Sequence, residues 1–329
     1  MNARKLAAYL EDFLTLKRTM AEADPHYSRV DRNQLNHRDR LLRAFFAFWQ
    51  KQECPWPIRA QFTLDWVGKG SDGQHPYRHL RRLQVVQAFL RQLRVFEPET
   101  EMPENIFRTW CGRRTPHIFS DQEIQQLMAA AQQSRLRHTL HPLTLCTLVG
   151  LLASTGLRIG EAIRLKVVDA RLAANPPHLL IYETKFGKSR HVVLHASTAA
   201  RLRSYLVERE KTFPHRVEES FFVNRSGRPL EYNSLFAGFQ RLLKRAGIQP
   251  IPGKRRPSFH SFRHGFAVKR LTQWHHEGRD VQDLLTHLAV YLGHVGPENT
   301  YWYLTATPEL LNTAAALFTP PPLNGGARL

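Results

Sequence analysis

Apolar residues recur every three or four positions through the first hundred residues, which is the period of an α-helix that buries one face. Prolines within 54–57 and several glycines within 68–73 interrupt this pattern and separate the helical stretches. We therefore predict a compact helical domain over residues 1–96. The predicted helices lie around 6–13 and over 36–50, 61–67 and 77–94.

Residues 97–117 contain three prolines and show no hydrophobic period, which predicts a linker. Ser120 and Glu123 then have the spacing of a capping box, in which each side chain accepts a hydrogen bond from the other residue's backbone N–H. This spacing predicts a helix that begins at Asp121. We therefore place a second domain at 118–318, followed by a proline-rich tail at 319–329.

Hydrophobic and polar residues alternate in 178–184 and again in 191–195, a pattern typical of half-buried strands. A basic segment lies between them, so we predict a β-hairpin with a basic tip, and 221–224 is predicted as a short third strand. The expected fold class is mainly α with a small antiparallel β-sheet. The predicted helices of this domain cover 121–134, 143–155, 159–167 and most of the chain from Glu231 onward.

The composition adds a strong positive charge. The chain carries 47 lysines and arginines against 28 acidic residues, a formal charge of +19. Both halves are basic, because residues 1–115 hold 20 basic and 13 acidic side chains and the remainder hold 27 and 15. Duplex DNA held through its phosphates is the simplest ligand for such a chain. A solvated basic surface without a ligand is the alternative.

The three cysteines are widely spaced and lack a Cys-x-x-Cys pair, so neither a disulfide framework nor a zinc site is indicated. The sequence also lacks the glycine-rich phosphate loop of nucleotide-driven enzymes, so we expect no cofactor and no metal. No apolar run reaches the roughly 18 to 20 residues of a membrane span, and the N-terminus has no signal-peptide core. We expect a cytoplasmic, nucleoid-associated protein that contacts no membrane.

Five short segments of the second domain carry residues that suit phosphodiester chemistry. In chain order they are Thr-Gly-Leu-Arg-Ile-Gly-Glu at 155–161, the lysine at 185, His-Ser-Phe-Arg-His at 260–264, Leu-Gly-His at 292–294 and the tyrosine at 303. Their order and spacing resemble the tyrosine recombinases, the family of phage integrases, Xer-type resolvases and transposon-borne recombinases. The resemblance covers most of 118–318. It implies an N-terminal helical core-binding (SAM-like) domain and a catalytic domain that close around DNA as a C-shaped clamp.

The residue types at these positions suit a phosphate even without the family. The planar guanidiniums of Arg158 and Arg263 can each offer two donors to non-bridging oxygens, where negative charge accumulates. His260 precedes Arg263 by three residues, so both lie on one helix face. His294 follows Gly293 at a turn, where an imidazole can donate to a phosphate oxygen. Structural alternatives are a surface arginine for Arg158, a helix cap for His260 and a helix C-terminus for the glycine–histidine pair.

Tyr303 is the predicted nucleophile, and Lys185 is the predicted acid that protonates the leaving 5′-hydroxyl. A phenol whose ordinary pKa is about 10 needs nearby positive charge, which two arginines and a histidine would supply. Tyr301 is the rival nucleophile, but on a helix it points about 200° away from Tyr303, so at most one of them faces the phosphate. Tyr303 stands nine residues beyond His294, where the nucleophile of the resembled family falls, and this spacing favours it over Tyr301. The alternatives are a core role for the aromatic cluster and, for Lys185, protection of a sheet edge.

Further basic residues are candidate contacts to the DNA backbone, namely Lys188 and Arg190 in the hairpin and Arg113 and Arg114 in the linker. The resemblance implies double-stranded DNA with a specific recombination site as the partner, and a homo-tetramer on that DNA. An apolar face on 308–317 predicts a final helix. The resemblance implies that this helix docks on the neighbouring protomer, and docking on its own protomer is the alternative.

The sequence thus predicts site-specific recombination through a 3′-phosphotyrosine intermediate, in the integration, excision, resolution or transposition of a mobile element. A type IB topoisomerase-like nicking and closing enzyme with the same residues is one alternative. A non-catalytic DNA-binding protein of the same fold is the other. The complete residue set argues against the second alternative, and the predicted final helix favours assembly over a lone topoisomerase.

Overall fold

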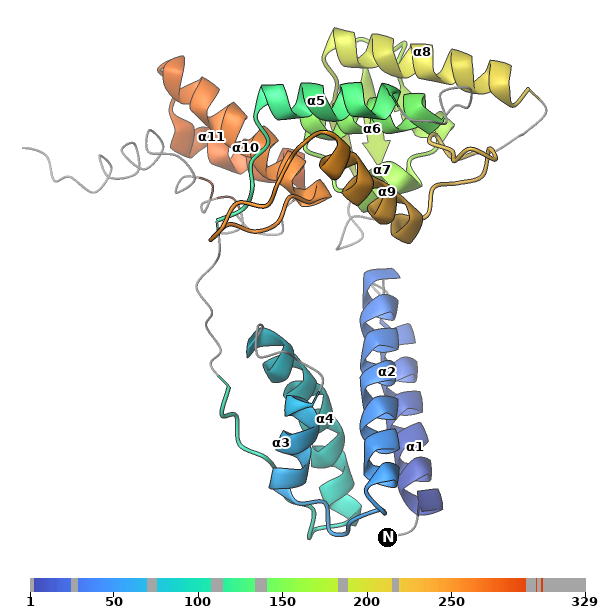
Figure 1. The fold of residues 1–329 in the computed structure, drawn as a ribbon, viewed down its shortest axis with the longest axis vertical. Helices are drawn as coiled ribbons and strands as arrows, with labels where there is room; N and C mark the ends of the chain where they lie inside the picture. The colour runs from blue at the N-terminus through green and yellow to red at the C-terminus, as the bar shows by residue number, and fades with distance from the viewer. Residues whose placement is uncertain are drawn as a thin grey trace, which may run out of the picture. The chain divides into compact units, whose positions relative to one another are not determined.

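The computed structural model describes residues 3–24, 29–69, 76–107, 115–133, 141–182, 189–214, 219–293, 300 and 303 (Figure 1). The chain divides into two compact units, Met1–Arg113 and Arg114–Leu329. Each unit has a hydrophobic core of its own, as expected of separate domains.

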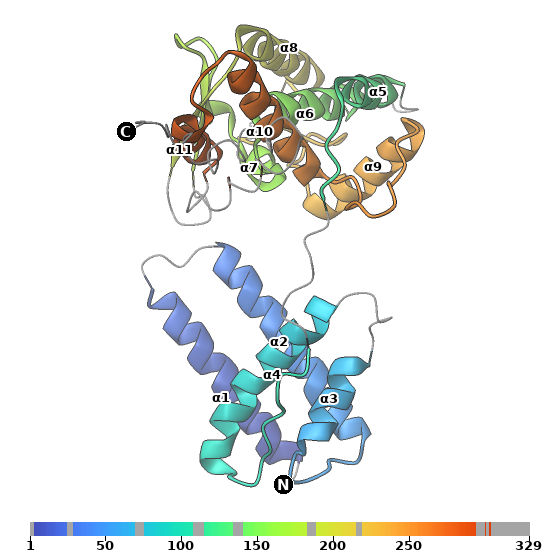
Figure 2. The ribbon, with the colours of Figure 1, turned by 90° about the vertical axis from the view of Figure 1, so that its left-hand side faces the viewer.

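In the described part of the first unit the helices are α1 (Ala3–Glu22), α2 (Arg29–Lys51), α3 (Ala60–Gly68) and α4 (Pro76–Phe96). α1 packs along α2, and α4 contacts the other three (Figure 2). Their apolar stripes face inward, with Leu6 and Leu10 of α1 buried as the helical period predicts. The helical character predicted for this part of the chain is therefore confirmed.

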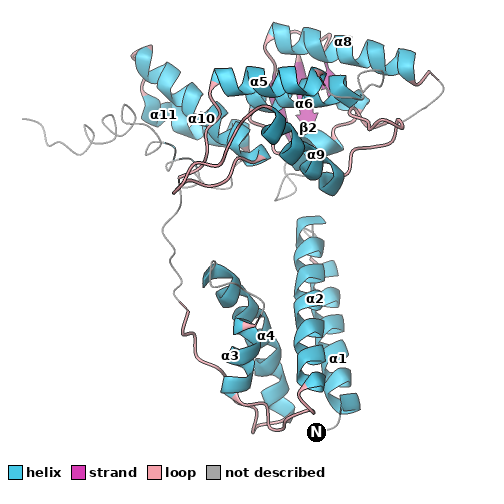
Figure 3. Ribbon diagram, viewed as in Figure 1, coloured by secondary structure: helices cyan, strands magenta, loops and turns pink. Residues whose placement is uncertain are grey.

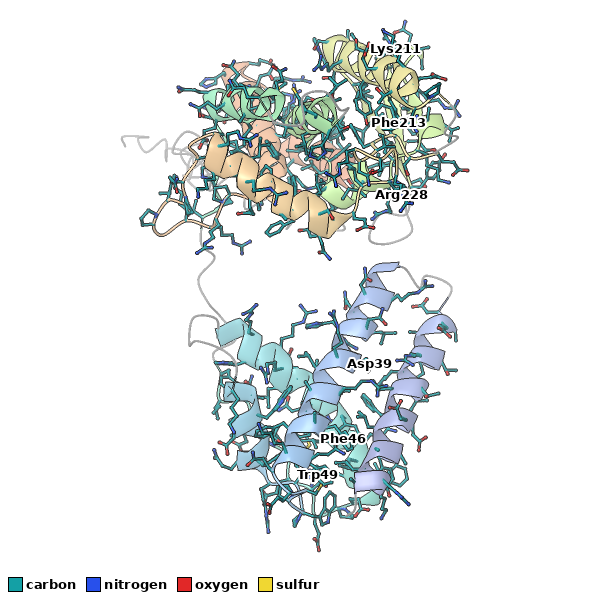
Figure 4. The ribbon with its side chains drawn as sticks, turned by 45° about the vertical axis from the view of Figure 1, so that its right-hand side comes forward. Asp39, Phe46, Trp49, Lys211, Phe213 and Arg228 are labelled. Carbon is teal, nitrogen blue, oxygen red and sulfur yellow. The ribbon has the colours of Figure 1, made fainter. Side chains whose placement is uncertain are left out.

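Aromatic side chains of α2 pack together at the end of this helix (Figure 4). Phe46 and Trp49 stack with ring centroids 5.8 Å apart, and Trp49 is fully buried. The indole N–H of Trp49 donates to Pro55 O at 2.8 Å, which satisfies the one polar atom of the buried ring. Asp39 pairs with Arg18 of α1 nearer the other end of α2.

The chain after α4 is bonded back onto the first unit. The Glu101 N–H donates to Ile58 O at 2.9 Å, and the Glu101 carboxylate accepts from Ala60 N at 2.8 Å. The Gln87 amide donates to Pro103 O at 2.8 Å. Residues 97–107, which the sequence predicts as the start of a linker, therefore follow the surface of this unit.

α6 (His141–Thr155) lies at the centre of the second unit. It is buried on nearly every side and packs against α5 (Asp121–Gln132), α8 (Ala196–Thr212) and α10 (Phe259–His276). A helix that is apolar all round is expected in such an interior position. Within the described ranges, no helix combines the length and the apolar character that crossing a membrane requires. The remaining elements include α7 (Ile159–Arg164), the 3-10 turn Val167–Asp169, α9 (Tyr232–Arg245) and α11 (Val281–Leu292).

A small antiparallel sheet in the order β1-β2-β3 accompanies these helices (Figure 3). β2 (His178–Ile181) pairs with β3 (Arg190–Val193) as the predicted hairpin requires, with the buried Leu179 opposite the buried Val192. β1 (Ala170–Arg171) completes the sheet. The predicted fold class, mainly α with a small antiparallel sheet, is confirmed.

The third strand of the sheet is β1, and not the segment 221–224 that the sequence predicts. Residues 221–224 form an isolated bridge, Val223 opposite Pro229, and do not join the sheet. Phe221 and Phe222 are both fully buried around the Tyr205 ring, so this apolar run belongs to a buried loop and lacks the two unlike faces of a strand.

Two further differences concern helices. The hydrophobic pattern does not predict α8, because only Ala199, Leu202 and Tyr205 of its 17 residues are buried and its apolar stripe is narrow. Residues 246–258 form a loop between α9 and α10, although the sequence pattern there was predicted to be helical.

The predicted capping box is present at the start of α5. Ser120 Oγ accepts from the Glu123 N–H at 3.1 Å, and the Glu123 carboxylate accepts from the Ser120 N–H at 2.9 Å. Two N–H groups that the helix leaves without partners are satisfied in this way. The second unit therefore begins its helical core at the predicted residue.

Replacing Ser120 by alanine removes the hydroxyl that accepts the Glu123 N–H, so we expect the free energy of unfolding of the second unit to fall by about 1 kcal/mol. Urea denaturation followed by circular dichroism measures this change. Gln125→Ala, at an exposed position of the same helix, is the control and should stay within about 0.5 kcal/mol of wild type. Equal stability of Ser120→Ala and wild type would contradict the expectation.

Candidate active site

Arg158 and Arg263 meet at the C-terminal end of α11. Arg158 directly precedes α7, and its Nη2 donates to Gly293 O at 2.9 Å. Arg263 lies in the first half of α10, and its Nη2 donates to Leu292 O at 2.6 Å. The last carbonyls of a helix lack intrahelical partners and carry partial negative charge, which explains why two guanidiniums gather there. The structure thus brings together the two arginines that the sequence singles out.

The two arginines differ in their access to solvent. The Arg158 side chain is 31% exposed, whereas Arg263 is 1% exposed. Burial, together with the nearby charge of Arg158, lowers the pKa of Arg263 to about 10, so it remains a cation at neutral pH. A phosphate at this place would meet Arg158 from the solvent side and Arg263 from the protein side.

Two glycines allow the chain to approach this closely. Gly156 has φ +65°, and a Cβ there would lie 2.7 Å from a ring carbon of Phe266. Gly293, the left-handed residue that ends α11, has φ +68°, and a Cβ there would lie 2.9 Å from Arg190 Nη1. Both the backbone conformation and the space require glycine at these positions.

Glu161 is a residue of this site that the sequence analysis did not single out. It is 4% exposed, and its carboxylate accepts from Arg158 Nη1 at 2.9 Å and from Arg190 Nη2 at 2.9 Å. Burial alone would raise its pKa, but the hydrogen bonds and charges of the two arginines outweigh that effect and hold the pKa at about 2. An acidic residue three positions after Arg158, the one acidic side chain between residues 155 and 165, is the signal that could have identified it.

We expected Arg190 to contact the DNA backbone, but most of its side chain is buried inside the protein. Its side chain is 9% exposed, both Nη atoms are bonded to Glu161, and Nε donates to Tyr291 O at 2.8 Å. The guanidinium is therefore engaged inside the protein, where a buried carboxylate competes with any phosphate.

Tyr303 lies beside Arg263. It is 1% exposed and packs in a small core cluster with Ala267 and Leu271 of α10. Removal from water raises the pKa of its phenol, while the charge and hydrogen bonding of Arg263, and more weakly the charge of Arg158, act in the opposite direction. The predicted nucleophile thus lies in contact with one predicted phosphate ligand.

Two histidines of α10, His260 and His264, lie next to these residues. His264 is buried, its ring makes an edge contact with Tyr303 at 5.5 Å between centroids, and it contacts His260 at 4.4 Å. His260 is solvent exposed, and a cavity of about 300 Å³ lies between it, Arg158 and Tyr232 of α9. The cavity beside Arg158 is therefore bordered by the predicted histidine.

The pKa of His260 is lowered to about 4, by partial loss of water and then by the positive charges of Arg263, Arg158 and Arg255. Both causes favour the neutral imidazole at pH 7, and a neutral imidazole can accept a proton.

Several predicted residues lie outside the described part of the chain. They are Arg113, Arg114, Lys185, Lys188, His294, the rival Tyr301 and the predicted helix at 308–317. Among the described residues, no group of three or more histidine, cysteine or acidic side chains could hold a metal ion.

Comparisons with known proteins agree on one family. The family model described as "Phage integrase family" matches residues 118–309. A Sinorhizobium fredii protein named as a candidate integrase/recombinase, y4rB, is 34% identical over 304 residues, 90% of this chain and 96% of its own. Tyrosine recombinase XerD of Corynebacterium glutamicum is 30% identical over 226 residues, 68% of this chain and 71% of its own.

Solved structures show the same fold at lower identity. The XerH site-specific recombinase bound to a palindromic difH substrate has a TM-score of 0.64 and 20% identity, over 87% of this chain and 80% of that chain. A lambda integrase tetramer bound to a Holliday junction has a TM-score of 0.65 and 15% identity, over 91% of this chain and 76% of that chain.

Glu161→Gln should flatten the dependence of stability on pH. Because the folded pKa of Glu161, about 2, lies below its unfolded value of about 4.5, its ionisation stabilises the fold above pH 4.5, and this stabilisation is lost as the pH falls through 2. Between pH 6 and pH 3 the free energy of unfolding of wild type should therefore drop by about 2 kcal/mol more than that of the variant. Urea titrations at both pH values measure the difference, and parallel pH profiles would refute it.

Proposed function

Since the chain belongs to the phage integrase family of tyrosine recombinases, we propose that it cuts and rejoins DNA at a specific site through a covalent bond between Tyr303 and a 3′-phosphate. The observation that carries the proposal is the grouping of Arg158, Arg263 and Tyr303 at the end of α11, where the charges of both arginines act on the Tyr303 phenol. Family membership supports recombination in general, and this geometry supports the particular nucleophile.

In the proposed reaction the scissile phosphate binds to Arg158 and Arg263, which neutralise the charge that grows on its non-bridging oxygens. The Tyr303 oxygen attacks phosphorus, the phenol gives up its proton, and the bond from phosphorus to the 5′-oxygen breaks. His260, neutral at pH 7, is suited to accept a proton or to bond the phosphate. Lys185 supplies the proton to the leaving 5′-hydroxyl.

The second half of the reaction runs in reverse with a different strand. The phosphotyrosine ester retains the energy of the original phosphodiester, so the 5′-hydroxyl of a partner strand can attack phosphorus and release Tyr303. No nucleotide cofactor is needed for this exchange of esters. His294, which follows the carbonyls bound by the two arginines, is the proposed further phosphate ligand.

We further propose double-stranded DNA with a recombination site as the substrate, bound by a homo-tetramer in the cytoplasm at the nucleoid. The charge of +19 supports the DNA partner, as do the DNA complexes named for the XerH and lambda integrase structures. Lys188, Arg113 and Arg114 are the proposed backbone contacts, and 308–317 is the proposed contact between protomers. The similarity to y4rB favours an element that integrates or excises.

The nucleophile can be tested on DNA selected by the protein itself. Duplexes bound by Tyr303→Phe are selected from a randomised pool, and the selected sequence is made into a suicide substrate with a nick beside the cleavage point. Wild type and Tyr301→Phe should form a covalent protein–DNA adduct on denaturing gels, and Tyr303→Phe should form none while still binding. An adduct with Tyr303→Phe would move the nucleophile to another residue.

The same DNA separates recombination from simple nicking and closing. Two duplexes of unequal length that carry the selected site should yield strands of hybrid length when incubated with wild type. Relaxation of a supercoiled plasmid without any hybrid strand would instead identify a topoisomerase-like enzyme. The absence of both products and of any adduct would leave a DNA-binding protein.

A further inference from the structure

Arg190 joins three elements around the candidate site. It begins β3, its Nε donates to Tyr291 O in α11 at 2.8 Å, and its Nη1 and Nη2 donate to the two oxygens of Glu161 in α7 at 3.1 and 2.9 Å. One planar group thus connects the strand that follows the hairpin tip, the helix that follows Arg158 and the helix that precedes His294.

Glu161 links Arg190 to Arg158. Its Oε1 accepts from Arg158 Nη1 at 2.9 Å, and its Oε2 accepts from the Arg158 N–H at 2.9 Å. The carboxylate is therefore bonded to Arg158 through both the backbone and the side chain, and to Arg190 through two parallel hydrogen bonds. The direction in which the Arg158 guanidinium points depends on a carboxylate that Arg190 holds in place.

The surroundings fit an arginine and not another cation. The pair is nearly buried, at 9% exposure for the Arg190 side chain and 3% for Glu161, so each charge depends on the other. Three donors in one plane reach two carboxylate oxygens and a backbone carbonyl, an arrangement that the single ammonium of lysine does not reproduce. Gly293 leaves the space that Arg190 occupies, since a Cβ there would lie 2.9 Å from Nη1.

We propose that Arg190 is a positioning residue for phosphate cleavage, which fixes Arg158 through Glu161 and the end of α11 through Tyr291 O without touching DNA. This inference rests on the proposed function, because it assigns Arg158 to the scissile phosphate. The sequence suggests that Arg190 contacts a phosphate directly. In this proposal Arg190 instead acts indirectly, by fixing the position of the Arg158 charge that the phosphate meets.

Single-turnover cleavage with excess protein tests the proposal. The selected suicide duplex is prepared with an ordinary phosphate and with a methylphosphonate at the cleavage point, in which an uncharged methyl group replaces one non-bridging oxygen and the linkage carries no negative charge. Wild type, Arg190→Lys and Arg203→Lys are compared. Arg203, which donates to Leu172 O at 3.1 Å, is a matched arginine remote from the site.

Arg190→Lys should lower the cleavage rate of the phosphate duplex by about 100-fold, the cost typical of one misplaced electrostatic donor. Its affinity for the duplex should change by less than about threefold, because no DNA contact is lost. On the methylphosphonate the loss should shrink to about tenfold or less, since less charge needs neutralising. Arg203→Lys should match wild type on both substrates.

Three results would overturn the inference. An equal loss of cleavage rate on the phosphate and methylphosphonate duplexes would show that Arg190 has a purely structural role. A loss of less than threefold would show that Arg190 has no role in cleavage. Weaker binding whose salt dependence falls by about one unit of slope would identify Arg190 as a phosphate contact after all. Failure of wild type itself to form an adduct on the phosphate duplex would instead overturn the proposed function, and this inference with it.

Arg190→Lys is checked for folding by circular dichroism. If it does not fold, the double variant Arg190→Gln/Glu161→Gln takes its place, because it removes both charges and leaves neither buried alone. The double variant should also lose more cleavage rate on the phosphate duplex than on the methylphosphonate duplex. Equal losses of rate on the two duplexes would again contradict the proposal.

Discussion

Arg158, Arg190 and Arg263 bring three positive charges into one small region of the second unit, where partial burial strengthens their mutual repulsion. The structure meets this constraint with one buried carboxylate, Glu161, and with the backbone carbonyls at the end of α11. These groups orient the arginines without cancelling their charge. A net positive charge remains in fixed positions, which is the property that a phosphate under attack requires.

The scaffold around this charge cluster is rigid for ordinary reasons of packing. α10 carries Arg263, His260 and His264 on its first turns, and it packs against the largely buried α6. Gly156 lies against the Phe266 ring, so the backbone before Arg158 is fixed by the same helix that carries Arg263. This helix–turn contact thus fixes the backbone positions from which the two arginines project.

Much of the fold follows from local patterns, and for that reason it could be predicted. The helical periods, the hairpin alternation and the capping box at Ser120 each depend on residues close in sequence. The run at 221–224 misled the prediction, because an apolar segment in a buried loop has the same composition as a short strand. α8 escaped prediction because its apolar stripe contains few residues.

The site was predictable only in part, since its residues meet through tertiary structure. Arg158 and Arg263 could be chosen by residue type and motif. The partnership of Arg190 with Glu161 joins positions 29 residues apart, and nothing in either segment identifies the other. In the sequence, a basic residue next to a predicted basic hairpin tip suggests a contact to DNA. The structure shows that Arg190 instead pairs with the buried carboxylate of Glu161.

The carbonyl groups of Leu292 and Gly293 have a consequence for selectivity. They occupy some of the donors of Arg158 and Arg263 in the free protein, so a phosphate that binds there competes with hydrogen bonds already made. A free inorganic anion gains little from such an exchange. A phosphate carried on a polymer that is gripped elsewhere can draw on the energy of those distant contacts to complete it. Under the proposed function, this competition couples cleavage to engagement of the whole DNA.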